Sequence, residues 1–215
     1  MPKWITCLKP SAHFLPESLF CPPAAKSPAA GLPGEFGRTC RRWGVVPTRW
    51  VLAASVPRQT AALFERVKGA QGGRWFPVYR TRRAFRISTA KNGVGQRQNS
   101  FQTPLGLHRV AAKVGGGWPL GTVFKARQPV GYLWRGLTGA VIAHRILWLE
   151  GLEPGWNRGG AVDTFARCIY VHGYGDETTL GRPASKGCIH LAADDLIPLF
   201  DLLPAGSLVW ISNTW

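Results

Sequence analysis

At 215 residues the chain suits one domain, or one domain with a tail, and its 45% hydrophobic content is enough for a buried core. No apolar stretch reaches the ~18 residues of a membrane-spanning helix, so no span is expected. The net charge of +16 predicts attraction to polyanions, but it does not choose among nucleic acid, anionic lipid and a charged cell-wall polymer.

The first 57 residues differ in composition from the rest. They hold nine of the seventeen prolines and show no sustained periodicity, so residues 1–57 are expected to be disordered, loosely attached or related to export. Arg41-Arg42 followed by the apolar Val51-Leu52-Ala53-Ala54 faintly resembles a twin-arginine signal, but the apolar segment is short and broken. The folded domain is therefore expected over residues 58–215.

From residue 58 onward the pattern is that of short strands separated by turns. Residues 60–67 indicate a strand or a helical turn, and branched and aromatic residues predict further strands. Those strands are expected over 75–79, 84–89, 107–113, 141–149, 167–172 and 208–211. Apolar residues at helical spacing predict one helix over 192–203, with Asp194 and Asp195 at its start. This pattern predicts a mainly β domain.

The segment from His172 to Cys188 carries the residues best suited to chemistry. Cys188 follows Gly187, and His172 lies upstream and is followed by Gly173. Together they provide the components of a thiol nucleophile and its base. A free cysteine is mostly the unreactive thiol at neutral pH, so a neighbouring imidazole is needed to activate it. The backbone N–H groups of Gly187 and Cys188 are candidate oxyanion donors.

These residues also resemble a known family. His172-Gly173 followed by Ser185-Lys186-Gly187-Cys188-Ile189 is similar to the signature of the L,D-transpeptidase (YkuD-type) catalytic domain. Other segments occur in the order that the family has: residues 87–90, 103–107, 121–124, 145–147 and 206–211. The resemblance implies a mainly β, sandwich-like fold with one or two short helices, no cofactor, and a place in the cell envelope or periplasm.

The resemblance also implies a reaction and its residues. Cys188 would attack an amide of a peptidoglycan stem peptide to form a thioester, which an amine of a second stem would resolve into an L,D cross-link. His172 would be the base, oriented by the Gly173 carbonyl, while Ser185, Lys186, Gly187 and His190 would line the oxyanion or substrate site. The family usually has His at the position of Lys186 and Arg at that of His190, so substrate preference or activity is expected to differ.

Other readings of the same residues stay open. The resemblance also allows a hydrolase of L,D-carboxypeptidase type that acts on the same stem peptides with water as acceptor. A non-catalytic module whose basic surface binds anionic cell-wall polymer is a further alternative. The basic run 79–86 fits a solvated strand face, and no nucleic-acid reading element is found, so no nucleic-acid partner is expected.

The remaining thiols and imidazoles have plainer expectations. Because the number of cysteines is odd, at least one thiol is left free. The sequence contains no close pair of metal ligands, so no metal site is expected. Cys168 is expected to be a buried strand residue, too far along its strand from His172 to bridge Cys188. His108 and His144 are expected to lie on the surface or in strands with their polar atoms satisfied.

Overall fold

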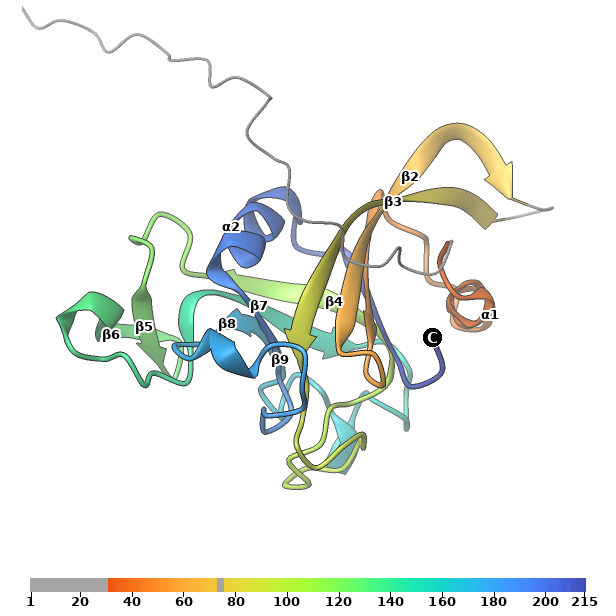
Figure 1. Cartoon of the computed structure of the whole chain (residues 1–215). Helices are drawn as coiled ribbons and strands as arrows, with labels where there is room; N and C mark the ends of the chain where they lie inside the picture. Colours follow the sequence, from red (N-terminus) through yellow and green to blue (C-terminus); the bar gives the residue numbers. More distant parts are fainter. Residues whose placement is uncertain (1–30, 73–75) are drawn as a thin grey trace, which may run out of the picture.

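The computed structural model describes residues 31–72 and 76–215, which form a mainly β fold with two α-helices (Figure 1). The strands are β1 (Trp50–Ser55), β2 (Thr60–Gly72), β3 (Phe76–Ser88), β4 (Gly106–Val114), β5 (Thr122–Lys125), β6 (Gln128–Tyr132), β7 (Ala143–Gly151), β8 (Tyr170–Gly173), β9 (Ile189–Leu191) and β10 (Leu208–Ser212). The helices are α1 (Gly34–Arg42) and α2 (Ala193–Leu202), with short 3-10 turns η2 (Leu133–Arg135), η3 (Gly160–Val162) and η4 (Glu177–Thr179). The expected mainly β class with one or two short helices is confirmed.

All ten strands belong to one sheet, in the order β4-β10-β1-β2-β3-β9-β8-β7-β5-β6. An additional pairing between β4 and β7 closes eight of these strands into a ring. The pairs β1–β10 and β8–β9 are parallel, while the other neighbours are antiparallel. The sandwich-like layering therefore takes the form of a closed sheet whose walls face each other across a common core.

The main core fills the inside of this ring. Alternate residues of the strands point inward because successive side chains of a strand face opposite sides, and α2 packs its apolar face onto them. The inward side chains include Leu52, Leu63, Ile87, Leu147, Leu149, Val171, Ile189, Leu191, Val209 and Ile211, together with Leu196, Leu199 and Phe200 of α2. The helix expected over 192–203 is confirmed as α2, which contains Pro198 and is tied to β3 by an ion pair between Arg83 and Asp195.

A second core lies outside the ring, under α1. Phe36 and Cys40 of α1 pack against Val51, Phe64 and Trp210 of the sheet. Strand β1 is buried along its whole length because one face meets this core and the other meets the main core. The expectation that residues 1–57 are disordered or loosely attached is therefore wrong for α1 and β1, while residues 1–30 lie outside the described part of the chain.

Several strand boundaries also differ from expectation. The strands expected over 75–79 and 84–89 are one long strand, β3, with residue 75 outside the described residues. Strand β8 begins at Tyr170 because residues 164–168 form a turn, in which Cys168 has a positive φ of 56°. The β5–β6 hairpin has no sequence signal because Ala126 and Arg127, rather than Gly or Asn, take the positive φ values of its turn.

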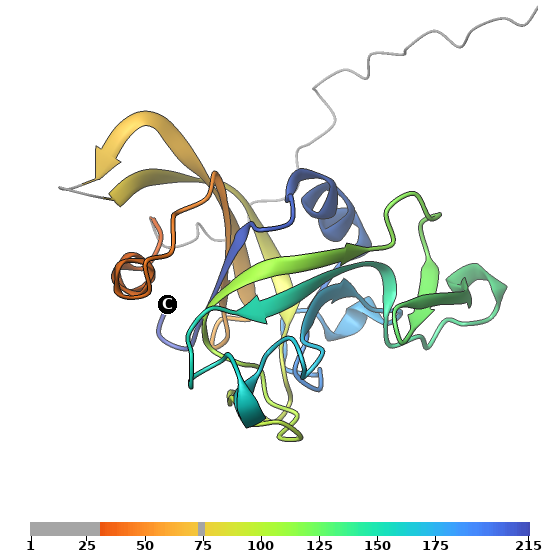
Figure 2. The ribbon, with the colours of Figure 1, turned by 180° about the vertical axis from the view of Figure 1, so that it is seen from behind.

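The long β2–β3 hairpin and the short β5–β6 hairpin stand at opposite ends of the molecule in both views (Figures 1 and 2). Strands β8 and β9, which carry His172, Gly173 and His190 and follow the turn that contains Cys188, lie between them (Figure 1). Within the described residues, no helix has the length and apolar character needed to cross a membrane.

Candidate active site

Two adjacent parallel strands position the predicted nucleophile and base. His172 on β8 pairs in register with His190 on β9, and Cys188 comes directly before β9. Because side chains alternate along an extended chain, Cys188 lies on the same face as His190, two residues later. Cys188 packs against the cluster that contains Tyr170, which precedes His172 by two residues on β8. The sheet thus brings Cys188 and His172 to one face of neighbouring strands.

The Cys188 sulfur is half-buried and bonded to the backbone of the neighbouring strand. The Tyr170 N–H donates to it at 3.4 Å, and the thiol faces the Cys168 carbonyl oxygen at 3.6 Å. Burial raises the pKa of the Cys188 thiol to about 11, although the Tyr170 N–H opposes this shift. Among the described residues no hydrogen bond joins Cys188 to His172. At neutral pH the resting site therefore holds a thiol rather than a thiolate.

His172 is buried, and its ring orientation is fixed by the backbone. Its Nδ1 lies 2.8 Å from the Gly173 carbonyl oxygen, and because a carbonyl can only accept, Nδ1 carries the proton. Nε2 is then the basic nitrogen. Burial lowers the pKa of His172 to about 4, against the Gly173 hydrogen bond, so the imidazole is neutral at pH 7. This tautomer is the one that a general base requires.

Position 173 has no room for a side chain. A Cβ there would lie 2.4 Å from Cδ2 of His144 and 2.8 Å from the Ala143 carbonyl oxygen, both on the start of β7. Glycine lets β7 and β8 pair closely at this point, where Ala143 and Gly173 are partners. The carbonyl that orients His172 is therefore held by strand pairing.

The turn before Cys188 is closed by one side chain. Ser185 Oγ donates to the Cys188 carbonyl oxygen at 2.6 Å and accepts from the Gly187 N–H at 3.2 Å. Of the two expected oxyanion donors, the Gly187 N–H is thus already bonded, whereas the Cys188 N–H has no hydrogen-bond partner within residues 31–72 and 76–215. The Lys186 side chain points to solvent.

His190, which is expected to line the oxyanion or substrate site, lies in a stack of rings. The His190 ring is buried, 4.6 Å from the Tyr174 ring at an angle of 17°, and 4.7 Å from the His172 ring. Burial, followed by the neighbouring His172, lowers the pKa of His190 to about 3. His190 Nδ1 has no hydrogen-bond partner in the described part of the chain. His190 is therefore a neutral buried ring, unlike the charged fork of an arginine.

A cluster beside the thiol was not predicted. Arg127 donates to the Tyr170 hydroxyl at 3.0 Å, lies 3.7 Å from the Cys168 sulfur, and covers the Trp148 ring at 4.4 Å. The expectation that Cys168 is a buried strand residue is wrong, because it occupies a half-exposed turn whose carbonyl approaches Cys188. Both cysteines are free.

Arg167 is a second unpredicted cation near the thiol. Its guanidinium donates to the carbonyl oxygens of Gly95, Gln96 and Gln102, at 3.1, 2.7 and 2.7 Å. These bonds tie the 95–102 loop to the turn before β8. Burial raises the pKa of Cys188, and the charge of Arg167 opposes part of that rise. Isolated arginines give no signal in the sequence, so neither Arg127 nor Arg167 could be found from a motif.

The other two described histidines lie in strands β4 and β7. His108 on β4 donates from Nδ1 to the Gly106 carbonyl at 3.0 Å, and His144 on β7 accepts from the Gly121 N–H at 3.0 Å. Both are buried rather than on the surface, and His108 Nε2 has no partner in the described residues. Within these residues no group of three His, Cys, Asp or Glu side chains could hold a metal ion.

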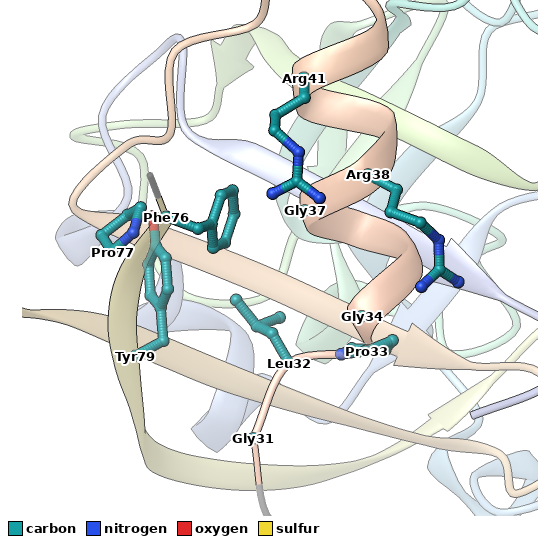
Figure 3. A pocket seen from close by; sticks show the side chains of 10 residues that line it. All are labelled: Gly31, Leu32, Pro33, Gly34, Gly37, Arg38, Arg41, Phe76, Pro77 and Tyr79. Carbon is teal, nitrogen blue, oxygen red and sulfur yellow. The ribbon is translucent and has the colours of Figure 1, made fainter. Parts of the chain in front are cut away.

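A pocket of about 480 Å³ lies elsewhere, between α1 and β3. Arg38 and Arg41 of α1 line it together with Phe76 and Tyr79 of β3, and Arg41 extends toward Phe76 (Figure 3). None of the residues predicted to act in catalysis lines it, and its lining contains no carboxylate, thiol or imidazole. The His172 imidazole on β8 and the Cys188 thiol just before β9 are therefore the stronger candidate for a reactive site.

Comparison with known proteins gives a family match over most of the chain. A family model described as the YkuD L,D-transpeptidase catalytic domain matches residues 55–211. This range contains both His172 and Cys188, and it begins at the end of β1. No curated protein matches the chain.

Solved structures with a similar arrangement share little sequence with this chain. An L,D-transpeptidase from Mycobacterium smegmatis is 17% identical with a TM-score of 0.44, and a Bdellovibrio bacteriovorus protein is 14% identical with a TM-score of 0.48. L,D-transpeptidase 3 from Mycobacterium tuberculosis, in complex with a faropenem-derived adduct, is 14% identical with a TM-score of 0.44. The matches cover 76%, 77% and 77% of this chain but 58%, 48% and 60% of theirs, so this chain spans about half to three fifths of their length.

Proposed function

Since this chain belongs to the L,D-transpeptidase catalytic domain family, we propose that it is a cysteine acyltransferase that acts on peptidoglycan stem peptides in the cell envelope. The observation that carries the proposal is the placement of Cys188 and a correctly tautomerised His172 on one face of two adjacent strands. Ser185, Gly187 and Gly173 then act as positioning residues, because they fix the turn and the imidazole through backbone bonds.

The resting protonation states define the first chemical step. The sulfur of Cys188 forms a bond to the carbonyl carbon of the donor amide while its proton passes to Nε2 of His172. The tetrahedral oxyanion accepts a hydrogen bond from the Cys188 N–H. Collapse breaks the C–N bond, and His172 returns the proton to the leaving amine, which leaves a thioester on Cys188.

The second step reverses the proton path. The amine of an acceptor stem attacks the thioester carbon and gives up a proton to His172. The C–S bond breaks and the sulfur recovers its proton from the imidazolium, so the thiol is regenerated. With water in place of the amine, the same steps make a hydrolase of carboxypeptidase type, and the geometry of His172 and Cys188 serves both outcomes.

Acylation by a carbapenem-type β-lactam tests the nucleophile directly, because opening of the lactam leaves a stable thioester on the attacking cysteine. Mass spectrometry of the intact chain is expected to show one adduct, mapped to Cys188 and absent in Cys188→Ala. His172→Ala is expected to slow acylation by about a hundredfold or more. Cys168→Ala is the matched control, since it removes the neighbouring half-exposed thiol and is expected to keep the adduct.

An adduct on Cys168, or equal acylation of His172→Ala, overturns the proposed site. Incubation with purified tetrapeptide muropeptides then separates the functions: dimers indicate transfer, and trimmed tripeptides without dimers indicate hydrolysis. Binding of cell-wall polymer that survives in Cys188→Ala, with no product from the unaltered chain, indicates a binding module.

A further inference from the structure

The segment around β5 and β6, residues 116–142, gathers apolar side chains on the surface; we refer to it as the β5–β6 lobe. Six of its large apolar side chains are 40–63% exposed: Trp118, Leu120, Val130, Trp134, Leu137 and Val141. They make up half of the exposed large apolar side chains in the described residues. A cluster of exposed apolar side chains of this size indicates a surface that interacts with a protein, a membrane or a ligand.

The exposed side chains of the lobe rest on an ordered scaffold. The Trp134 ring lies over the bare backbone of Gly121, where a Cβ would come within 2.5 Å of it, and stacks on Tyr132 at 4.6 Å. Leu137 covers Gly131 in the same way, at 2.7 Å from a Cβ placed there. The two glycines thus let the Trp134 and Leu137 side chains pack directly on the backbone, while the outer faces of these side chains stay in solvent.

The charge of the lobe has one sign. It contains Lys125, Arg127 and Arg135 but no aspartate or glutamate, and the sequence has no acidic residue at all between Glu65 and Glu150. Lys125 and Arg135 are exposed and form no ion pair in the described part of the chain. One other segment is bonded to the base of the lobe, because the Gly175 N–H donates to the Ala140 carbonyl oxygen. Two acids, Asp176 and Glu177, follow Gly175 in that segment.

We propose that the β5–β6 lobe docks onto the surface of an anionic lipid bilayer. Tryptophan and tyrosine rings favour the headgroup level because they are apolar with one polar edge. Exposed cations beside them are attracted to anionic headgroups by about 1 kcal/mol each, or about fivefold in affinity. The lobe also projects from one end of the molecule in both views (Figures 1 and 2), a shape that can enter a headgroup layer more readily than it can match a flat protein surface.

Docking would set the candidate active site at a fixed place relative to the bilayer. The lobe joins the sheet where Val123 pairs with Ala143, and Ala143 also pairs with Gly173, next to His172. The lobe and the imidazole are thus connected through two backbone pairings. The inference does not depend on the proposed reaction, because binding to lipid is measured without substrate.

Co-sedimentation of the full chain with vesicles tests the proposal. The chain is expected to bind vesicles of phosphatidylcholine mixed with phosphatidylglycerol, and to bind pure phosphatidylcholine vesicles at least tenfold more weakly. Lys125→Gln/Arg135→Gln is expected to lower affinity for the anionic vesicles by about twentyfold. Trp134→Ala is expected to lower it by about tenfold through loss of the inserted ring.

Matched controls separate the lobe from the general positive charge of the chain. Lys91→Gln/Arg97→Gln removes two exposed cations from the 91–100 loop, and Trp156→Ala removes an exposed tryptophan outside the lobe. Both are expected to bind within about twofold of the unaltered chain. A thermal melt of each variant, compared with that of the unaltered chain, shows that the lobe stays folded.

Equal losses in the lobe and control variants would show that binding follows net charge alone, and this overturns the proposal. So does an absence of vesicle binding, including the case in which the lobe binds a soluble anionic polymer such as polyglutamate or a protein instead. Loss of vesicle binding in the lobe variants with unchanged acylation of Cys188 supports docking as separate from the proposed chemistry.

Discussion

The Cys188 thiol and the His172 imidazole are both held uncharged, which constrains how they can react. Burial raises the pKa of Cys188 to about 11 and lowers that of His172 to about 4. A preformed thiolate would make up only about one part in ten thousand at pH 7. Attack by the thiol with simultaneous proton transfer to the neutral imidazole avoids this cost, because the base is fully available at that pH.

The dependence of acylation on pH distinguishes these two routes. With His172 as base, the carbapenem acylation rate is expected to stay nearly constant from pH 7 to about 5 and to fall near pH 4, where the imidazole becomes protonated. In His172→Gln the rate is expected to fall about tenfold per pH unit below pH 7, because only the thiolate can then attack. Stopped-flow or mass-spectrometric rates, with circular dichroism at each pH, provide the measurement.

His190 supplies the control for this profile, since its ring lies 4.7 Å from that of His172 on the neighbouring strand. His190→Phe keeps an aromatic ring against Tyr174 and is expected to retain the flat profile of the unaltered chain. A tenfold-per-unit slope in the unaltered chain would show that His172 is not the base. A slope that appears only in His190→Phe would show the same.

At the level of elements, β1 joins the two cores. Leu52 faces the inside of the ring, whereas Val51 faces α1, and β1 pairs with β2 on one side and β10 on the other. Removing it would expose two strand edges in the middle of the sheet and open both cores. The minimal folded unit therefore has to include α1 and β1.

Truncation tests this requirement. A chain that begins at residue 58 is expected to be insoluble or unfolded, and Leu52→Ala is expected to lower the free energy of unfolding by about 2–5 kcal/mol. Val46→Ala is the matched control because that side chain is 79% exposed, and it is expected to change stability by less than about 0.5 kcal/mol. Denaturant melts measure both substitutions, and a cooperative transition in the truncated chain would contradict the role of β1.

The sequence predicted these elements unevenly, for physical reasons. Proline density marked residues 1–57 as unstructured, but seven of the nine prolines there precede Gly34, and the buried strand β1 has only six residues. Strands such as β4, β7 and β10 were foreseen because their branched residues alternate between flanking turns. The β5–β6 hairpin was not, since its tight turn uses Ala126 and Arg127.

The site was predicted from its motif but not in its contacts. His172 and Cys188 could be named because a thiol after glycine and an imidazole before glycine are local patterns. The bond from the Tyr170 N–H to the Cys188 sulfur, and the ring stack of Tyr174 and His190, depend on which strands become neighbours. Sequence spacing does not specify that pairing, and Cys168 was misplaced for the same reason.

Across the whole molecule, charge is divided along the chain in a way that composition alone conceals. The acid-free stretch between Glu65 and Glu150 includes both the basic half of the β2–β3 hairpin and the β5–β6 lobe. In the hairpin, Glu65 pairs with Arg49, Arg80 and Arg82, and these arginines lower the pKa of Glu65. The lobe at the opposite end has no such acid, which leaves its exposed cations Lys125 and Arg135 available to an outside partner.

The four described histidines are all buried, and they make the fold sensitive to mild acid. Burial lowers the pKa of His172 to about 4 and those of His108 and His190 to about 3, and it also lowers the pKa of His144. Below pH 6.5 the unfolded chain therefore binds protons that the folded chain excludes, so stability falls as pH falls. The contribution of the neutral histidines to stability is fully present above about pH 6.5, and it is lost progressively as the pH falls toward their folded-state pKa values.

Thermal melts between pH 8 and pH 5 are expected to show a melting temperature that is constant above about pH 7 and then falls by several degrees. Carboxylates with lowered pKa values, such as Glu65 and Asp176, protonate below about pH 4.5, so they do not contribute in this window. His108→Asn keeps a donor for the Gly106 carbonyl but removes one titrating ring, and it is expected to flatten the decline. A melting temperature that does not change from pH 7 to pH 5 would show that these rings are hydrated enough to accept protons in the folded chain.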